Sequence, residues 1–134
     1  MAQNSNCSLF KFLDDSIELT DVIAPIFLTQ AVLPYLSKGG RIVIISSVSA
    51  RMGVPQQTVY AATKAATEAL VRVWATELGH DYGVTVNAIA PGPVATEMYY
   101  ASDQGFVNSM QPMINSTPAA PRLGEISDIV PIVA

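Results

Sequence analysis

Three residues have the types and the spacing that proton transfer at a carbonyl or alcohol oxygen requires. Tyr60 and Lys64 stand four residues apart in a segment with helical periodicity, so their side chains are expected on one helix face. A phenol is a weak acid with a reference pKa of about 10, and a nearby cation favours its ionised form. Ser47, at the end of an apolar run, is suited to hydrogen-bond the same oxygen. The three types together favour acid/base chemistry.

The Tyr60–Lys64 spacing alone is weak evidence for a catalytic site, because an exposed tyrosine beside a solvated lysine is common on helices. The elements around it carry more information. The β-branched residues 42–45 lie between Gly39-Gly40 and Ser46-Ser47, which predicts a strand over residues 41–47 buried on both faces. A helix is predicted from residue 58 or 59 to about residue 82, closed by Gly83. A second buried strand is predicted over residues 84–90, before Pro91-Gly92-Pro93.

Strand, helix and strand predict one βαβ unit with parallel strands and a right-handed crossover. Parallel strands end at the same edge of a sheet, so Ser47 and the loop that opens at Pro91 are expected side by side. Ligands of open α/β sheets bind outside these carboxyl ends. Two separate pieces of the sequence therefore predict one cleft.

The remaining segments complete a single incomplete domain predicted over residues 1–134. Residues 1–15 are expected to be an irregular lead-in, and residues 16–93 a helix-strand-helix-strand core whose first helix is weakened by Pro25 and Pro34. Residues 94–124 are expected to form a flap over a substrate, or else a surface loop or helix pair packed on the core. Residues 125–134 predict the start of a final helix, with Glu125 or Ser127 near its N-terminus.

Composition restricts the class of protein. The chain has 134 residues, of which 50% are hydrophobic and 13% charged, as in a globular domain with much buried surface. The net charge of −4 and the lack of a Lys/Arg cluster argue against nucleic acid or an anionic membrane as a partner. A lone cysteine, Cys7, predicts no internal disulfide, no metal site and a reducing compartment. Without a membrane-length apolar run or a signal peptide, a cytoplasmic protein is expected.

The motifs together resemble a known family. Residues 42–47, Tyr60-Ala-Ala-Thr-Lys64 and Val86-Asn-Ala-Ile-Ala-Pro-Gly-Pro-Val-Ala-Thr96 are similar to those of the short-chain dehydrogenase/reductase family, over about residues 22–130. The resemblance implies an α/β fold that is the C-terminal half of a Rossmann-like, three-layer doubly wound sheet. It also implies hydride transfer between NAD(H) or NADP(H) and a small-molecule carbonyl or alcohol.

The resemblance implies a role for each matching residue. Tyr60 would be the catalytic acid/base, Lys64 would assist it and bind the nicotinamide ribose, and Ser47 would orient the substrate. The nicotinamide end of the cofactor would be held by Pro91, Gly92, Val94 and Thr96. In the family the two long helices pack against a partner subunit, so a homo-oligomer is expected.

Two departures from the family pattern stand out. The first strand and its glycine-rich, pyrophosphate-binding turn are missing, together with the residue that selects NAD or NADP, so the chain resembles a truncated member. Asp21 aligns with an active-site asparagine of the family and would bring charge near Tyr60 and Lys64. The ordinary alternative is an aspartate on the helix surface.

Two other functions fit the same residues. A truncated, non-catalytic relative would act through oligomerisation, and a cofactor-independent dehydratase or isomerase would use the Ser-Tyr-Lys site for acid/base work alone. Among the remaining polar residues, Ser46 is the alternative to Ser47. Glu68 and Arg72 are predicted to pair on the helix surface. His80 is expected to cap the end of the helix, where a cation is favourable.

Overall fold

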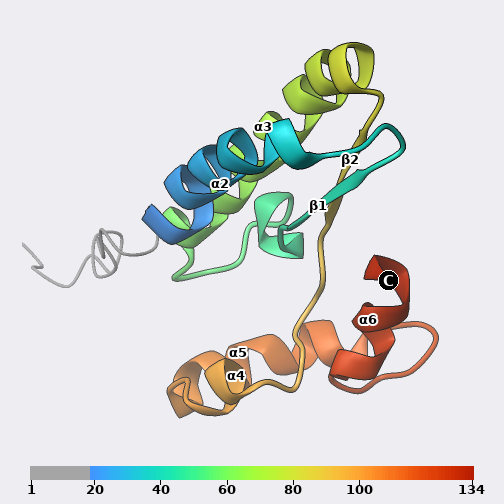
Figure 1. Ribbon diagram of the computed structural model, residues 1–134. Coiled ribbons are helices and arrows are strands. Elements are labelled where there is room, and N and C mark those ends of the chain that lie inside the picture. The colour runs from blue at the N-terminus through green and yellow to red at the C-terminus, as the bar shows by residue number, and fades with distance from the viewer. Residues whose placement is uncertain (1–18) are drawn as a thin grey trace, which may run out of the picture. The chain divides into compact units, whose positions relative to one another are not determined.

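The computed structural model describes residues 19–134, so the expected irregular lead-in and Cys7 lie outside the described residues. Two compact units follow one another along the chain, the first ending at Ala90 and the second comprising Pro91–Ala134 (Figure 1). The expectation that the chain forms a single domain stays a prediction.

The first unit begins with a widened, π-helical turn, Leu19–Ile23, which leads into helix α2 (Ala24–Val32) and a 3-10 turn, Leu33–Tyr35. Pro25 is the second residue of α2 and follows the π-helical turn directly, so its missing N–H falls where one helical hydrogen-bond pattern gives way to another. Pro34 lies in the 3-10 turn. The two prolines therefore stand at the changes of helical geometry, as their effect on helices predicts.

A parallel pair of strands forms the sheet of the first unit. Strands β1 (Arg41–Ile45) and β2 (Thr85–Ile89) are in register from Arg41 opposite Thr85 to Ile45 opposite Ile89. This confirms the predicted βαβ unit. The prediction that the strands are buried on both faces is wrong, because Ile45 is 47% exposed. Alternate side chains of the strands point to opposite faces, and those facing the core pack against one helix.

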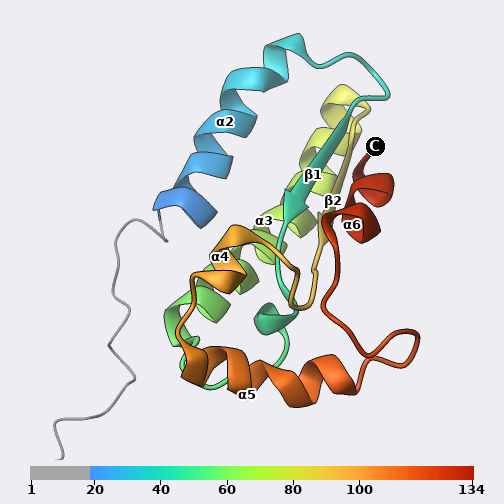
Figure 2. The same ribbon diagram turned by 90° about the horizontal axis from the view of Figure 1, so that it is seen from below.

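That helix is α3 (Thr58–Tyr82), which matches the predicted span and runs beside the strands (Figures 1 and 2). Gly83 closes it with a φ of +63°, a conformation that costs glycine little. The buried cluster joins the helix to the strands. It consists of Val71, Leu78, Val84 and Val86, with Leu33, Leu36, Ile42, Ile44, Trp74 and Ala88 packed around it.

The second unit contains helices α4 (Glu97–Tyr100), α5 (Gln104–Asn115) and α6 (Ile126–Val133). A parallel bridge between Val94 and Gly124 joins the segment before α4 to the segment before α6. Residues 94–124 contain α4 and α5, and Met110 and Ile114 of α5 are buried, whereas the flap and its alternative, packing on the core, stay predictions. Glu125 stands at the N-cap of α6 as expected, and its N–H donates to Asp128 Oδ2 at 2.7 Å.

Candidate active site

Ser47 lies just beyond the end of β1 and is buried. Its Oγ accepts a hydrogen bond from the Ser49 N–H at 3.2 Å, which fixes the start of the 3-10 turn Val48–Ala50. A hydroxyl has one hydrogen to donate and two lone pairs. The bond from Ser49 uses one lone pair, and the Ser47 hydroxyl makes no donated bond recorded among residues 19–134.

Ser46 is committed to a structural network instead. Its Oγ lies 3.2 Å from both Glu68 Oε1 and the Lys64 carbonyl oxygen, and Arg51 Nε donates to Glu68 Oε2 at 2.9 Å. Glu68 is only 7% exposed, so the predicted surface pair with Arg72 is wrong. The carboxylate holds the end of β1 to α3, and this role has no local signal because its partners lie 17 and 22 residues away in sequence.

Tyr60 and Lys64 share one face of α3, as their spacing predicts. The Lys64 Nζ lies 5.6 Å from the centroid of the Tyr60 ring, within the range of a cation–π contact. The same ammonium donates to the carbonyl oxygen of Ile45 at 3.1 Å, two residues before Ser47. Lys64 therefore links the tyrosine to the strand end from which the serine emerges.

The structure also brings Asp21 to this ammonium. Asp21 Oδ1 accepts from Lys64 Nζ at 2.8 Å, and its Oδ2 accepts from Thr63 Oγ1 at 3.1 Å. Asp21 is thus not a free aspartate on the helix surface, but a half-buried partner of Lys64. Its contact with Thr63 is one that the sequence reasoning missed, because 42 residues separate the two in the chain.

The four residues expected to hold the nicotinamide belong to the second unit. Pro91 and Gly92 follow directly on the residue after β2. Val94 is in the bridge with Gly124, and the Thr96 Oγ1 caps α4 by accepting from the Tyr99 N–H at 3.3 Å. No heavy atom lies within 4 Å of the place where a Cβ on Gly92 would stand, so the backbone there is open to close approach by a ligand.

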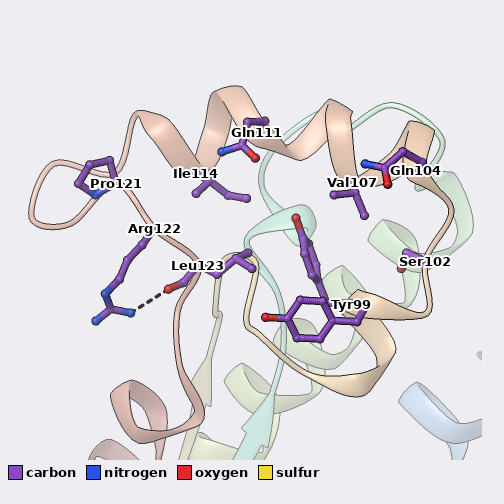
Figure 3. Close-up of a pocket in the computed structure, with 10 residues that line it drawn as sticks. Tyr99, Ser102, Gln104, Val107, Gln111, Ile114, Pro121, Arg122 and Leu123 are labelled. Atoms are coloured by element: carbon purple, nitrogen blue, oxygen red, sulfur yellow. Dashed lines mark hydrogen bonds between the residues drawn. The ribbon is translucent and has the colours of Figure 1, made fainter.

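A hollow of about 370 Å³ opens within the second unit (Figure 3). Val107 and Ile114 reach into it from α5, opposite Tyr99 and Leu123 (Figure 3). Its wall is mixed, with two aromatic rings and four apolar side chains beside a serine, two glutamines and an arginine. The lining residues are Tyr99, Tyr100, Ser102, Gln104, Val107, Gln111, Ile114, Pro121, Arg122 and Leu123.

The one charged group of this hollow, Arg122, is already paired. Its guanidinium donates to both carboxylate oxygens of Asp128, at 2.8 and 3.2 Å. That hydrogen bonding, with a further bond from the Glu125 N–H, lowers the pKa of Asp128 to about 2. The same contact raises the pKa of Arg122. The pair therefore adds little net charge to the hollow.

Other kinds of site are not found in the described part of the chain. Residues 19–134 contain no group of three His, Cys, Asp or Glu side chains placed to hold a metal ion. None of their helices has both the length and the hydrophobicity needed to cross a bilayer. His80 is exposed in the last turn of α3, where a cation is favourable. Among residues 19–134 the structure records no contact between His80 and Ser47, Tyr60 or Lys64.

Comparison with known proteins identifies the family. Residues 15–134 match a family model described as enoyl-(acyl carrier protein) reductase. The chain is 47% identical over 123 residues to the short-chain dehydrogenase/reductase FrzI of Cladobotryum sp, a match that covers 90% of the chain and 48% of that relative. The chain belongs to the short-chain dehydrogenase/reductase family. The α/β fold is accordingly part of a Rossmann-like fold.

Solved structures of the family bind nicotinamide cofactors. A small-chain dehydrogenase in complex with NADPH is similar with a TM-score of 0.72 and 32% identity, over 85% of this chain and 51% of that one. A 4-hydroxyisoleucine dehydrogenase complexed with NADH is similar with a TM-score of 0.70 and 29% identity, over 90% and 51%. The chain thus spans about half the length of the short-chain dehydrogenases/reductases that it matches.

Proposed function

We propose that this chain carries the acid/base half of an oxidoreductase that interconverts a small-molecule carbonyl and an alcohol with NAD(H) or NADP(H). The observation that carries the proposal is the Lys64 ammonium, which contacts both the face of Tyr60 and the end of β1 near Ser47. This contact supports the proposal because it connects the helix face that carries the phenol and the cation to the carboxyl edge of a parallel sheet, where ligands of such sheets bind.

Ser47, Tyr60 and Lys64 have different roles in the proposed reaction, which follow from the hydrogen bonds each can make. In the reducing direction, the Ser47 hydroxyl donates to the carbonyl oxygen and orients it. Tyr60 then transfers its phenolic proton to that oxygen as the alcohol forms, and the nearby ammonium of Lys64 favours the phenolate that remains. In the oxidising direction Tyr60 takes the proton back from the alcohol.

The nicotinamide would supply the hydride in reduction and accept it in oxidation. Lys64 and Tyr60 would contact its ribose, and Pro91, Gly92, Val94 and Thr96 would hold the nicotinamide end. The residues fit that task, because Gly92 leaves its backbone accessible and the Thr96 hydroxyl retains a hydrogen to donate. Family members with NADPH and with NADH support a nicotinamide cofactor of either type.

A matched pair of variants tests the proposal. Tyr60→Phe removes the acid/base group and is expected to lower kcat by roughly a hundred- to ten-thousand-fold, whereas cofactor binding, which loses only one hydroxyl contact to the ribose, should weaken far less. Tyr82→Phe removes a hydroxyl from the other end of α3, where the side chain is 43% exposed, and should leave kcat unchanged. The measurement is NADH or NADPH oxidation with a panel of ketones, alongside cofactor binding by fluorescence.

The outcomes separate the alternative functions. Product formation without added nicotinamide would favour a dehydratase or isomerase that uses the same residues. Absence of both binding and turnover would favour a relative that acts through association. Equal loss of activity in the two variants would contradict the role of Tyr60.

We also propose that the chain self-associates through α2 and α3. Phe27 and Leu28 of α2 are 64% and 65% exposed. On α3 the exposed residues Ala62, Ala65, Ala69 and Val73 follow one another at helical spacing, so they form one apolar stripe. Small residues on such a stripe allow close approach of another helix.

A further inference from the structure

The Lys64 ammonium is held by two acceptors before any cofactor is considered. Asp21 Oδ1 lies 2.8 Å from it and the Ile45 carbonyl oxygen 3.1 Å. The side chains of Lys64 and Asp21 are only 12% and 15% exposed, so the ion pair is weakly screened by solvent. An ammonium has three N–H donors, and two of them are therefore engaged.

Asp21 is itself held in a fixed orientation. Its second oxygen lies 3.1 Å from the Thr63 hydroxyl, which shares its one hydrogen with the Tyr60 carbonyl oxygen at 2.9 Å. Thr63 is 5% exposed. Thr63 precedes Lys64 on α3, whereas Asp21 comes from the π-helical turn Leu19–Ile23. π-helical turns occur often at functional sites. With both oxygens engaged, the carboxylate lies between two adjacent residues of α3.

We propose that Asp21 is a positioning residue that fixes the Lys64 ammonium and offsets its charge, leaving one N–H for a ligand. This rests on the proposed function, in which that ligand is a ribose hydroxyl of the nicotinamide cofactor. The carboxylate influences Tyr60 through Lys64, because it offsets the positive potential that the ammonium exerts on the tyrosine ring 5.6 Å away.

The charges around Lys64 support this assignment. The groups that the structure places against the ammonium are the Asp21 carboxylate, the Tyr60 ring and the Ile45 carbonyl. The next carboxylate along α3, Glu68, is engaged by Ser46 and Arg51. Among residues 19–134, Asp21 is thus the carboxylate that pairs with Lys64, and its replacement removes the opposite charge that those residues place in contact with the ammonium.

The experiment uses the reactivity of the three lysines, Lys11, Lys38 and Lys64, toward an amine-acylating ester. Only the neutral amine reacts, so labelling rates measured by peptide mass spectrometry report how strongly each ammonium is stabilised. Asp21→Asn keeps the size and one acceptor oxygen but removes the charge. We expect Lys64 labelling to rise about tenfold, the lower end of the effect of a contacting opposite charge, with Lys38 as the internal reference.

Thr63→Val is the matched control. It removes the hydrogen bond to Asp21 Oδ2 but keeps the carboxylate, so Lys64 labelling should change less than about twofold on the same scale. A purely structural role for Asp21 predicts similar labelling in the two variants, or no rise in Asp21→Asn, and either result would overturn the proposal. If Asp21→Asn fails to fold by circular dichroism, Asp21→Glu gives a second comparison. Low Lys64 labelling in that variant would support the charge role, and a tenfold rise would refute it.

The labelling needs neither cofactor nor turnover, so its result is separate from the proposed oxidoreductase activity. Binding of NADH and NADPH to the same samples tests that activity independently. If Lys64 is labelled tenfold faster in Asp21→Asn and the protein binds neither nucleotide, the Asp21–Lys64 assignment stands and the proposed function is rejected. If Lys64 labelling is unchanged and the protein binds a nucleotide, the assignment is rejected and the proposed function stands.

Discussion

At the scale of single residues, hydrogen-bond capacity decides which polar groups remain available for chemistry. Ser46 directs its Oγ to α3, whereas Ser47 uses its Oγ only to accept from Ser49. Lys64 has two of its three donors engaged. Within the described residues, the Ser47 hydroxyl and one N–H of Lys64 thus remain without a recorded acceptor, as the proposed function requires.

Asp128 offers a prediction about protonation at the same scale. Its pKa is lowered to about 2 by the Arg122 hydrogen bonds and the Glu125 N–H. A carboxyl whose folded pKa is depressed contributes stability above its unfolded pKa of about 4, and this is lost as pH falls through about 2. Carboxyl ¹³C shifts measured against pH should give this midpoint in the wild type.

Substitution of the arginine tests the cause of that shift. Arg122→Gln is expected to move the Asp128 midpoint upward, since the largest contribution is removed while the Glu125 N–H bond remains. Arg122→Lys keeps the charge without the planar fork and should give an intermediate value. A midpoint unchanged in Arg122→Gln would contradict the assignment.

At the scale of elements, the connection between β1 and α3 positions the candidate site. Ser46, Arg51 and Lys64 all reach from one element to the other, and Glu68 is the acceptor for the first two. The loop after β1 is therefore tied to the helix that carries Tyr60. Rigid attachment of this kind keeps a hydroxyl and a phenol in a fixed relation.

Replacement of Glu68 should loosen that connection. In Glu68→Gln only one side-chain oxygen accepts, so either Ser46 or Arg51 faces an amide N–H instead. We expect a loss of about 1 kcal/mol in the free energy of unfolding, measured by urea denaturation, because the charge-assisted bond from Arg51 is weakened while Ser46 can still accept from the amide. Glu77→Gln makes the same change at an exposed position of α3 and should cost almost nothing. Equal effects would show that Glu68 does not join the two elements.

At the scale of the whole molecule, uncovered apolar surface is the main physical feature. The sheet of the described residues has two strands, so each has one edge without a strand partner. Unpaired edges and exposed apolar helices favour association. The chain also spans about half the length of the relatives that it matches, and self-association through α2 and α3 would cover part of this surface.

A charge placed on the α3 stripe should weaken that association. Ala69→Glu introduces a carboxylate among exposed apolar residues and is expected to shift the chain toward monomer, because burial of an unpaired charge is costly. Ala75→Glu makes the same substitution at an exposed position on another side of the helix. Sedimentation velocity over a concentration series measures both. A monomeric wild type, or equal shifts in the two variants, would contradict the proposed interface.

The sequence by itself determined the features that depend on local pattern. The span of α3, its end at Gly83, the parallel strands and the common face of Tyr60 and Lys64 all follow from periodicity and short-range chain geometry. Tertiary structure alone decided that Asp21 pairs with Lys64, that Glu68 is buried and that Ser46 turns toward α3. Their partners lie 43, 17 and 22 residues away, and the distance between such residues is set by the packing of elements, which no local pattern records.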